Sequence, residues 1–232
     1  MAAPAEPTIH WSKKPLTLRI ISAAVLIPIV VAAVFAGGIA WMLLVFLFSA
    51  VMIVEWCKIA SRKPGAVPWY ALGLVYVFVP CAALIWLRAD PGVGLQQIFW
   101  IVALVIAADT GAYIAGRSIG GPKLAPLISP NKTWAGLGGA VVSAAIVGAI
   151  TAVLMDLPSV AILTAISAGL AVIEQIGDLA ESAFKRHFGV KDASNIIPGH
   201  GGALDRVDGL IAVAAAVAGI NHLIGSSVLT WL

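Results

Sequence analysis

Residues 18–56 read LRIISAAVLIPIVVAAVFAGGIAWMLLVFLFSAVMIVEW and carry no charged side chain between Arg19 and Glu55. A helix needs about 20 mostly apolar residues to cross the hydrocarbon core of a bilayer, so this run is long enough for two passes. Gly37 and Gly38 divide the run, and a glycine pair is typical of a tight turn. The stretch therefore predicts two membrane-spanning helices joined by a short turn.

The remainder of the chain continues this apolar pattern. Further apolar stretches lie at roughly 69–87, 96–115, 134–155, 158–176 and 208–230, which brings the number of predicted spans to seven. The 232 residues are 61% hydrophobic and 11% charged, with a mean hydropathy of +1.02. Soluble domains carry roughly 25% charged residues, so the composition excludes a soluble domain, a disordered chain and a basic nucleic-acid-binding protein. The predicted fold class is all-α: a polytopic membrane helical bundle of about seven transmembrane helices.

The basic residues predict how this bundle is oriented. Lys and Arg collect in the cytoplasmic loops of membrane proteins. With the N-terminus in the cytoplasm, seven spans place thirteen of the fourteen basic residues on that side and only Arg88 on the other. We expect a mobile tail over 1–17, N-terminal transmembrane helices over 18–100, and over 101–232 a transmembrane core with cytoplasmic loops.

Two polar stretches on the cytoplasmic side interrupt the apolar pattern. The first is DTGAYIAGRSIGGPKLAPLISPNKTW, from Asp109 to Trp134, and the second is EQIGDLAESAFKRHFGVKDASNIIPGHGGALDRVD, from Glu174 to Asp208. Both are rich in residues that let backbone N–H groups approach an anion. These stretches are therefore the candidate functional site.

Acidic side chains recur at helical spacing in the second stretch. Asp178, Glu181, Ser182 and Lys185 share one helical face, on a helix that continues out of an apolar span. A solvated face with a Glu181–Lys185 ion pair is one interpretation, but ionisable groups at membrane depth are costly and usually functional. A second pair follows at Asp205 and Asp208.

This combination of charges is typical of phosphoryl or nucleotidyl transfer. Carboxylates are suitable ligands for Mg²⁺, which is usually held by one or two of them together with substrate phosphates. Basic side chains would offset the phosphate charge, and the candidates are Lys132, Lys185, Arg186 and Arg206. No GxxxxGK[ST] sequence is present, so the chain is not a P-loop protein.

The second stretch resembles the C-terminal motif of the phosphatidate cytidylyltransferase (CDP-diacylglycerol synthase) family. The matching positions are Ser182, Phe184, Lys185, Arg186, Lys191, Asp192, Ser194, Ile197, Pro198, His200, Gly201, Gly202, Asp205, Arg206, Val207 and Asp208. Ala203 departs from the pattern, because the family usually has a bulkier apolar residue there. The segments DTGAYIAGRSIG (109–120), SPNKTWAG (129–136) and GDLAES (177–182) also resemble the family, so the specific likeness covers about residues 105–215.

The resemblance implies a reaction: CTP and phosphatidate give CDP-diacylglycerol and pyrophosphate, which feeds phospholipid synthesis. It implies an enzyme in the inner (plasma) membrane whose site faces the cytoplasm, acting on CTP and phosphatidate in the bilayer, with Mg²⁺ and a second cation such as K⁺. A homodimer is a further expectation, and no nucleic acid is expected as a partner.

Residue roles follow from the same resemblance. The catalytic residues would be Asp178, Lys185, Arg186, Asp205 and Arg206. The substrate-binding residues would be Ser129, Asn131, Lys132, Thr133, Ser182, His200, Gly201 and Gly202, and the metal ligands Asp178, Asp205 and Asp208.

Two alternatives to this function stay open. A related membrane transferase could use another lipid acceptor or act as a CTP-dependent lipid-alcohol kinase. A transporter or channel could bind cations through Asp178 and Asp205, but it would leave the GRSIGGPK, SPNKT and HGG segments without a purpose. Only the enzyme predicts CTP-dependent release of pyrophosphate.

Several polar residues have simpler interpretations. Glu55, beside Trp56, is expected to extend toward the membrane interface. Asp109 is expected at the end of its span, either facing the interface or contacting the nucleotide or the 129–133 loop. Glu174 could face the same cavity as Asp178, one turn further on. For His200 we favour loop shaping over general-base catalysis, because a phosphate monoester with a second pKa of about 6 is already a competent nucleophile.

Overall fold

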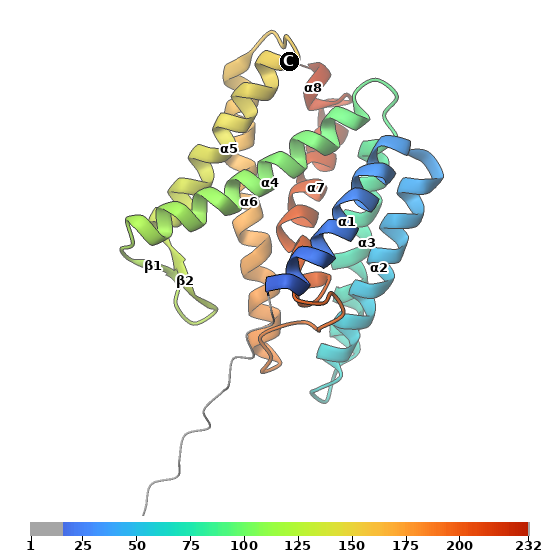
Figure 1. Ribbon diagram of the computed structural model, residues 1–232, viewed down its shortest axis with the longest axis vertical. Helices are drawn as coiled ribbons and strands as arrows, with labels where there is room; N and C mark the ends of the chain where they lie inside the picture. The colour runs from blue at the N-terminus through green and yellow to red at the C-terminus, as the bar shows by residue number, and fades with distance from the viewer. Residues whose placement is uncertain (1–15, 232) are drawn as a thin grey trace, which may run out of the picture.

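The computed structural model describes residues 16–231 and is a bundle of membrane-length helices (Figure 1). The helices are α1 (Leu16–Ala36), α2 (Gly38–Ala60), α3 (Val67–Arg88), α4 (Gly94–Ser118), α5 (Trp134–Leu154), α6 (Val160–His187), α7 (Leu204–Ile224) and the short α8 (Val228–Trp231). Seven of the described helices are long and apolar enough to cross a membrane, which confirms the predicted fold class. The predicted tail falls outside the described residues except for 16 and 17, which already belong to α1.

The α1–α2 turn lies where the glycine pair predicts it. α1 ends at Ala36, and Gly37 has a φ of 61°, a backbone conformation that favours glycine. Arg88 is the one basic residue expected on the non-cytoplasmic side. It donates from Nε to the carbonyl of Val34 at 2.7 Å and from Nη2 to that of Phe35 at 3.2 Å. Its guanidinium therefore satisfies carbonyls at the C-terminal end of α1.

Small residues allow α4, α5 and α6 to pack closely. The buried residues of α5 are Gly136, Ala140, Ala144, Gly148 and Ala152, which recur every fourth position and form a single stripe. A Cβ on Gly148 would collide with Ser167 and Leu163 of α6, and one on Gly139 with Gly111 of α4. Helices in lipid associate largely through such close backbone approach, so these small residues hold α5 between its two neighbours.

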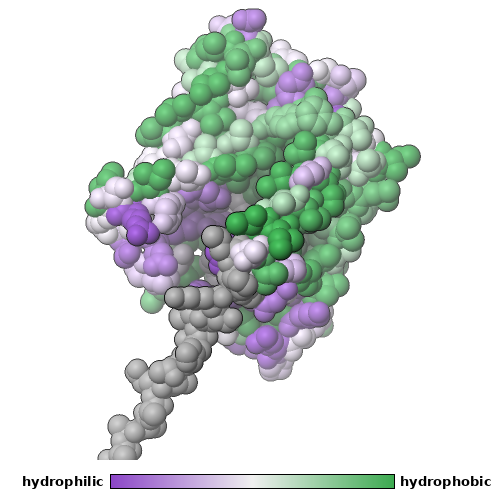
Figure 2. All heavy atoms as spheres, in the orientation of Figure 1, coloured by the Kyte–Doolittle hydropathy of each residue, from purple (hydrophilic) through white to green (hydrophobic). Residues whose placement is uncertain are grey.

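The polar connections gather at one end of the bundle. Between α4 and α5 an antiparallel hairpin pairs β1 (Lys123–Ala125) with β2 (Ser129–Thr133), an element that the sequence did not predict. α6 is 28 residues long and continues beyond its apolar part to His187, as expected. Figure 2 shows hydrophilic side chains around the hairpin and at the lower end of the molecule, below a broad hydrophobic surface.

Candidate active site between β2, α6 and the start of α7

Lys132 of β2 and Asp178 of α6 form the first part of the site. The Lys132 Nζ lies 2.6 Å from Asp178 Oδ2 and donates to Gln175 Oε1 at 2.7 Å. The hydroxyl of Ser182, one turn further along α6, donates to Asp178 Oδ1 at 3.2 Å. The structure thus brings together three predicted site residues that lie up to 50 positions apart in the sequence.

A cavity of about 140 Å³ opens beside this ion pair, and Asn131, Thr133 and Asp109 contribute to its walls. Asp109 lies inside α4, which continues to Ser118, so the expectation that Asp109 ends its span was wrong. The alternative expectation holds in part, because the cavity brings Asp109 to the 129–133 segment. Glu174 is buried and accepts a hydrogen bond from Gln175 at 2.8 Å, and the charge of Asp109 acts on it. The acidic side chains that line the cavity around Lys132 are those of Asp109 and Asp178, whereas Glu174 is not among the lining residues.

Lys185 forms the second part of the site, and it lies between two carboxylates. Its Nζ is 2.5 Å from Glu181 Oε2 and 2.7 Å from Asp205 Oδ1. The side chain of Glu181 is 0% exposed, and its Oε1 has no hydrogen-bond partner among the described residues. The Glu181–Lys185 ion pair is confirmed, but it is buried rather than solvated. Lys185 can reach a phosphate only by weakening one of these contacts.

Asp205 organises the loop that precedes α7. Its carboxylate accepts the amide of Ala193 at 3.0 Å and that of Gly202 at 3.0 Å, in addition to the Lys185 ammonium. Gly201 has a φ of 97°. A Cβ on Gly202 would lie 2.8 Å from Glu55 Oε1 and 3.0 Å from Asp205 Oδ2. The two glycines are therefore needed for the shape of the loop.

Glu55 corrects one expectation. It does not extend toward the interface: its side chain is buried in α2, where it accepts the amides of Ala203 at 3.0 Å and Leu204 at 2.8 Å. It also accepts a hydrogen bond from the hydroxyl of Ser194. A carboxylate at the start of a helix satisfies unpaired N–H groups and interacts favourably with the helix dipole. Its position at the end of an apolar span is equally typical of an interfacial residue, so only the fold distinguishes the two roles.

His200 shapes the same loop from its other side. The ring Nδ1 lies 2.7 Å from the hydroxyl of Ser22 in α1, and the His200 carbonyl accepts Nε of Arg206 at 2.7 Å. Arg19, also in α1, donates from Nε to the carbonyl of Gly199 at 3.1 Å. These contacts agree with a loop-shaping role for His200. No local sequence pattern links Arg19 to this loop, since 180 residues separate Arg19 from Gly199.

The remaining predicted residues are less central. Thr133 is buried and caps α5, where its hydroxyl accepts the amide of Gly136 at 3.0 Å. Ser129 pairs with Ala125 in the hairpin. Arg186 is exposed, and it donates to the carbonyl of Ile128 at 3.3 Å and to that of Val190 at 3.0 Å, so it fastens the hairpin to the end of α6.

The three predicted metal ligands, Asp178, Asp205 and Asp208, are not equally suited to hold a cation. The described residues contain no group of three His, Cys, Asp or Glu arranged as a metal site. Asp205 has both oxygens engaged by protein donors. Asp178 and Asp208 interact electrostatically with each other, and two hard carboxylates suit Mg²⁺ when phosphates complete its shell. The donor set therefore fits a magnesium ion at Asp178 and Asp208 better than at Asp205. Cys57 and Cys81 are free thiols.

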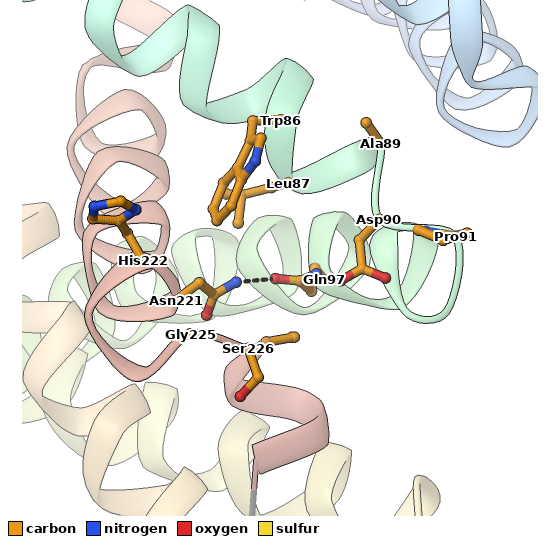
Figure 3. A pocket seen from close by; sticks show the side chains of 11 residues that line it. Trp86, Leu87, Ala89, Asp90, Pro91, Gln97, Asn221, His222, Gly225 and Ser226 are labelled. Carbon is orange, nitrogen blue, oxygen red and sulfur yellow. Dashed lines mark hydrogen bonds between the residues drawn. The ribbon is translucent and has the colours of Figure 1, made fainter.

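A pocket of about 530 Å³ lies at the opposite end of the helices (Figure 3). Asn221 of α7 donates to Gln97 of α4 at 2.7 Å there and accepts the amide of Val228. No Lys or Arg is among the described residues that line this pocket, so it lacks the groups that bind a polyphosphate.

Comparison with known proteins identifies the family. The profile of the "Cytidylyltransferase family" matches residues 17–84 and 65–224. A protein of Rickettsia bellii named phosphatidate cytidylyltransferase is 37% identical over 91% of this chain and 93% of its own length. Proteins of the same name from Brucella suis and Bacillus subtilis are 46% and 42% identical over 63% of this chain. The chain aligns with about half of their length, 54% and 55%. With most of its residues matched by the family profile, this seven-span chain belongs to the cytidylyltransferase family.

Proposed function

We propose that the protein is a phosphatidate cytidylyltransferase, which converts CTP and phosphatidate into CDP-diacylglycerol and pyrophosphate and so feeds phospholipid synthesis. The observation that carries the proposal is the convergence of β2, α6 and the start of α7 on one charged site at the ends of membrane-spanning helices. A water-soluble nucleotide and a lipid phosphate can meet at such a place. The likeness to the Rickettsia bellii protein over 91% of the chain supports it.

In the proposed reaction an oxygen of the lipid phosphate attacks the α-phosphorus of CTP, and pyrophosphate leaves. No covalent intermediate with the protein is needed, so catalysis depends on positioning and on charge stabilisation. Mg²⁺ held by Asp178 and Asp208 would neutralise charge on the phosphate oxygens, with K⁺ as the proposed second cation. Lys132, at the mouth of the cavity, exchanges its contact with Asp178 for a phosphate oxygen of CTP.

Lys185, Asp205 and Glu55 hold the loop of residues 193–204 in this proposal. Lys185 and Asp205 fix its two sides, and Glu55 fixes its junction with α7. The backbone of Gly201 and Gly202 is then presented to the anionic substrates without an obstructing side chain. Arg206, which is exposed at the start of α7, supplies a further positive charge.

We also propose that this end of the bundle faces the cytoplasm of a cell whose inner membrane holds the protein. The excess of Lys and Arg at the site end supports this orientation, since Arg88 is the one basic residue at the opposite end among residues 16–231. CTP is then available on the correct side. The homodimer stays a proposal, which the mass of the protein in detergent tests.

The deciding experiment is product formation by purified protein given phosphatidate, CTP and Mg²⁺, with the lipid read by mass spectrometry. We expect CDP-diacylglycerol that disappears with EDTA and with Asp178→Asn. Asp156→Asn is the matched control, since Asp156 lies in the α5–α6 turn with a φ of 50°, which Asn also tolerates. A folded protein that binds CTP without forming product would indicate another acceptor. Absence of CTP binding would favour the cation transporter.

A further inference from the structure

An apolar groove of about 480 Å³ lies between the first two helices, next to the loop of residues 193–204. Its walls are Ile21, Val25 and Leu26 of α1 and Leu47, Phe48 and Val51 of α2. Ile197, Pro198 and Ala203 of the loop close one end. Ser22 is the one polar side chain among the described residues that line it. Figure 1 shows α1 at the front of the bundle, directly above this loop.

Two basic side chains bind the loop beside the closed end of the groove. Arg19 and Arg206 donate through Nε to two consecutive carbonyls, those of Gly199 and His200. Among the described residues these are the hydrogen bonds that the two guanidinium groups make, so their terminal nitrogens are left to bind an anion. Two cations on neighbouring carbonyls repel each other, and a phosphate bound to both would remove that cost.

The length of the groove matches one half of a bilayer. From Leu18 to Leu26 the rise of α1 is about 12 Å at 1.5 Å per residue. One leaflet of a hydrocarbon core about 30 Å thick is about 15 Å deep. Because α1 and α2 are both membrane-spanning helices, the groove runs from the charged loop into the depth that acyl chains occupy.

The groove is also continuous with the charged site. Ala203 lines the groove, while its own amide binds Glu55 and the preceding amide of Gly202 binds Asp205. A single turn of backbone therefore separates the apolar groove from the Lys185–Asp205 pair. A ligand with an anionic head at Arg19 and Arg206 and an apolar tail toward Leu47 would fit both parts.

We propose that this groove binds an acyl chain of the lipid phosphate substrate, with Arg19 and Arg206 holding its phosphate. The inference rests on the proposed function, because phosphatidate is the anionic lipid that this reaction consumes. Bulk bilayer lipid is the competing occupant, and the second test below separates it from the substrate.

The first test narrows the groove and compares two chain lengths. Leu47 and Leu43 lie one turn apart on α2 and are 62% and 64% exposed, but only Leu47 lines the groove. We expect Leu47→Trp to raise the KM for a dioleoyl phosphatidate about tenfold. This is the loss of affinity that follows when about two methylene groups of the acyl chain lose their contacts. The KM for dihexanoyl phosphatidate and the KM for CTP stay unchanged. Leu43→Trp should have the same KM as the unaltered protein for both lipids. Equal effects of the two substitutions on the KM for the long lipid would overturn the proposal.

The second test does not depend on turnover. A phosphatidate analogue with a photoreactive diazirine near the end of one acyl chain is irradiated with the unaltered protein. We expect labelled peptides from residues 21–26 and 47–51, competed away by phosphatidate and not by phosphatidylcholine. Labelling that phosphatidylcholine removes equally well means bulk lipid, labelling at other helices means another site, and either result rejects the groove.

Arg19 tests the charged end. Arg19→Gln should raise the KM for both the long and the short phosphatidate, with the KM for CTP unchanged, and Arg19→Lys should recover part of the loss. An unchanged lipid KM in Arg19→Gln would remove Arg19 from the site. If the unaltered protein makes no CDP-diacylglycerol from either lipid, the proposed function itself fails, which is a distinct outcome from equal behaviour of the two tryptophan variants.

Discussion

The carboxylate of Glu55 accepts the amide of Leu204 at 2.8 Å, across 149 residues of sequence. This contact joins the first membrane hairpin to the first turn of α7. Since Asp205 and Arg206 follow Leu204 directly, the position of α2 determines where those side chains lie. The N-terminal helices therefore contribute to the geometry of the site, although the motif segments that stand out in the sequence lie within about residues 105–215.

Replacing Glu55 should disturb catalysis more than nucleotide binding. In Glu55→Ala the amides of Ala203 and Leu204 and the hydroxyl of Ser194 lose their acceptor, and a buried unpaired group costs about 1–3 kcal/mol. We expect a lower thermal midpoint and at least a tenfold lower kcat, with a smaller change in the KM for CTP. Glu55→Gln keeps one acceptor oxygen, so its thermal midpoint and kcat should lie between those of the unaltered protein and those of Glu55→Ala. Normal kcat in Glu55→Ala would show that the loop holds its shape without this cap.

Removing Lys185 should unfold the site rather than merely weaken substrate binding. Lys185→Met leaves Glu181 and Asp205 as uncompensated, largely buried carboxylates, and breaking a buried ion pair in this way costs about 3–5 kcal/mol. Combining it with Glu181→Gln should recover part of the loss, because one of the two buried charges is then gone. Thermal unfolding of the two single variants and the double variant measures the coupling. If the two substitutions lower the stability additively, the Glu181–Lys185 ion pair contributes little to stability.

Periodicity and composition were sufficient to predict the helices, whereas the contacts of the site required the fold. Apolar runs and the Gly37–Gly38 turn predicted seven spans because a bilayer imposes a minimum length on each helix. The Glu181–Lys185 pair was predictable because it is local in sequence. The contacts of Glu55 with Leu204, of Arg19 with Gly199 and of Lys132 with Asp178 join distant segments, and no local pattern records them. The β1–β2 hairpin was missed because it has only three and five residues per strand.

The Lys132–Asp178 pair should matter for activity and little for stability. The Asp178 side chain is 31% exposed, and ion pairs with such access to solvent contribute about 0–1 kcal/mol. Asp178→Asn should abolish turnover while the thermal midpoint stays close to that of the unaltered protein. Lys132→Ala should raise the KM for CTP and keep a measurable kcat. A magnesium titration of both variants checks the assignment, since only Asp178→Asn should shift the Mg²⁺ requirement.

Gly202 should not tolerate even a methyl group. A Cβ at this position would lie 2.8 Å from Glu55 Oε1, 2.9 Å from Ala193 Cβ and 3.0 Å from Asp205 Oδ2, and two of these atoms belong to carboxylates already fixed by hydrogen bonds. Gly202→Ala should therefore displace the loop and lower both the thermal midpoint and kcat. Gly219→Ala in α7 is the matched control, because its Cβ would meet nothing within 4 Å and alanine favours a helix by about 1 kcal/mol over glycine. Equal activity of the two variants would show that the loop can move aside, and the close approach of Glu55 and Asp205 would then not be required for the reaction.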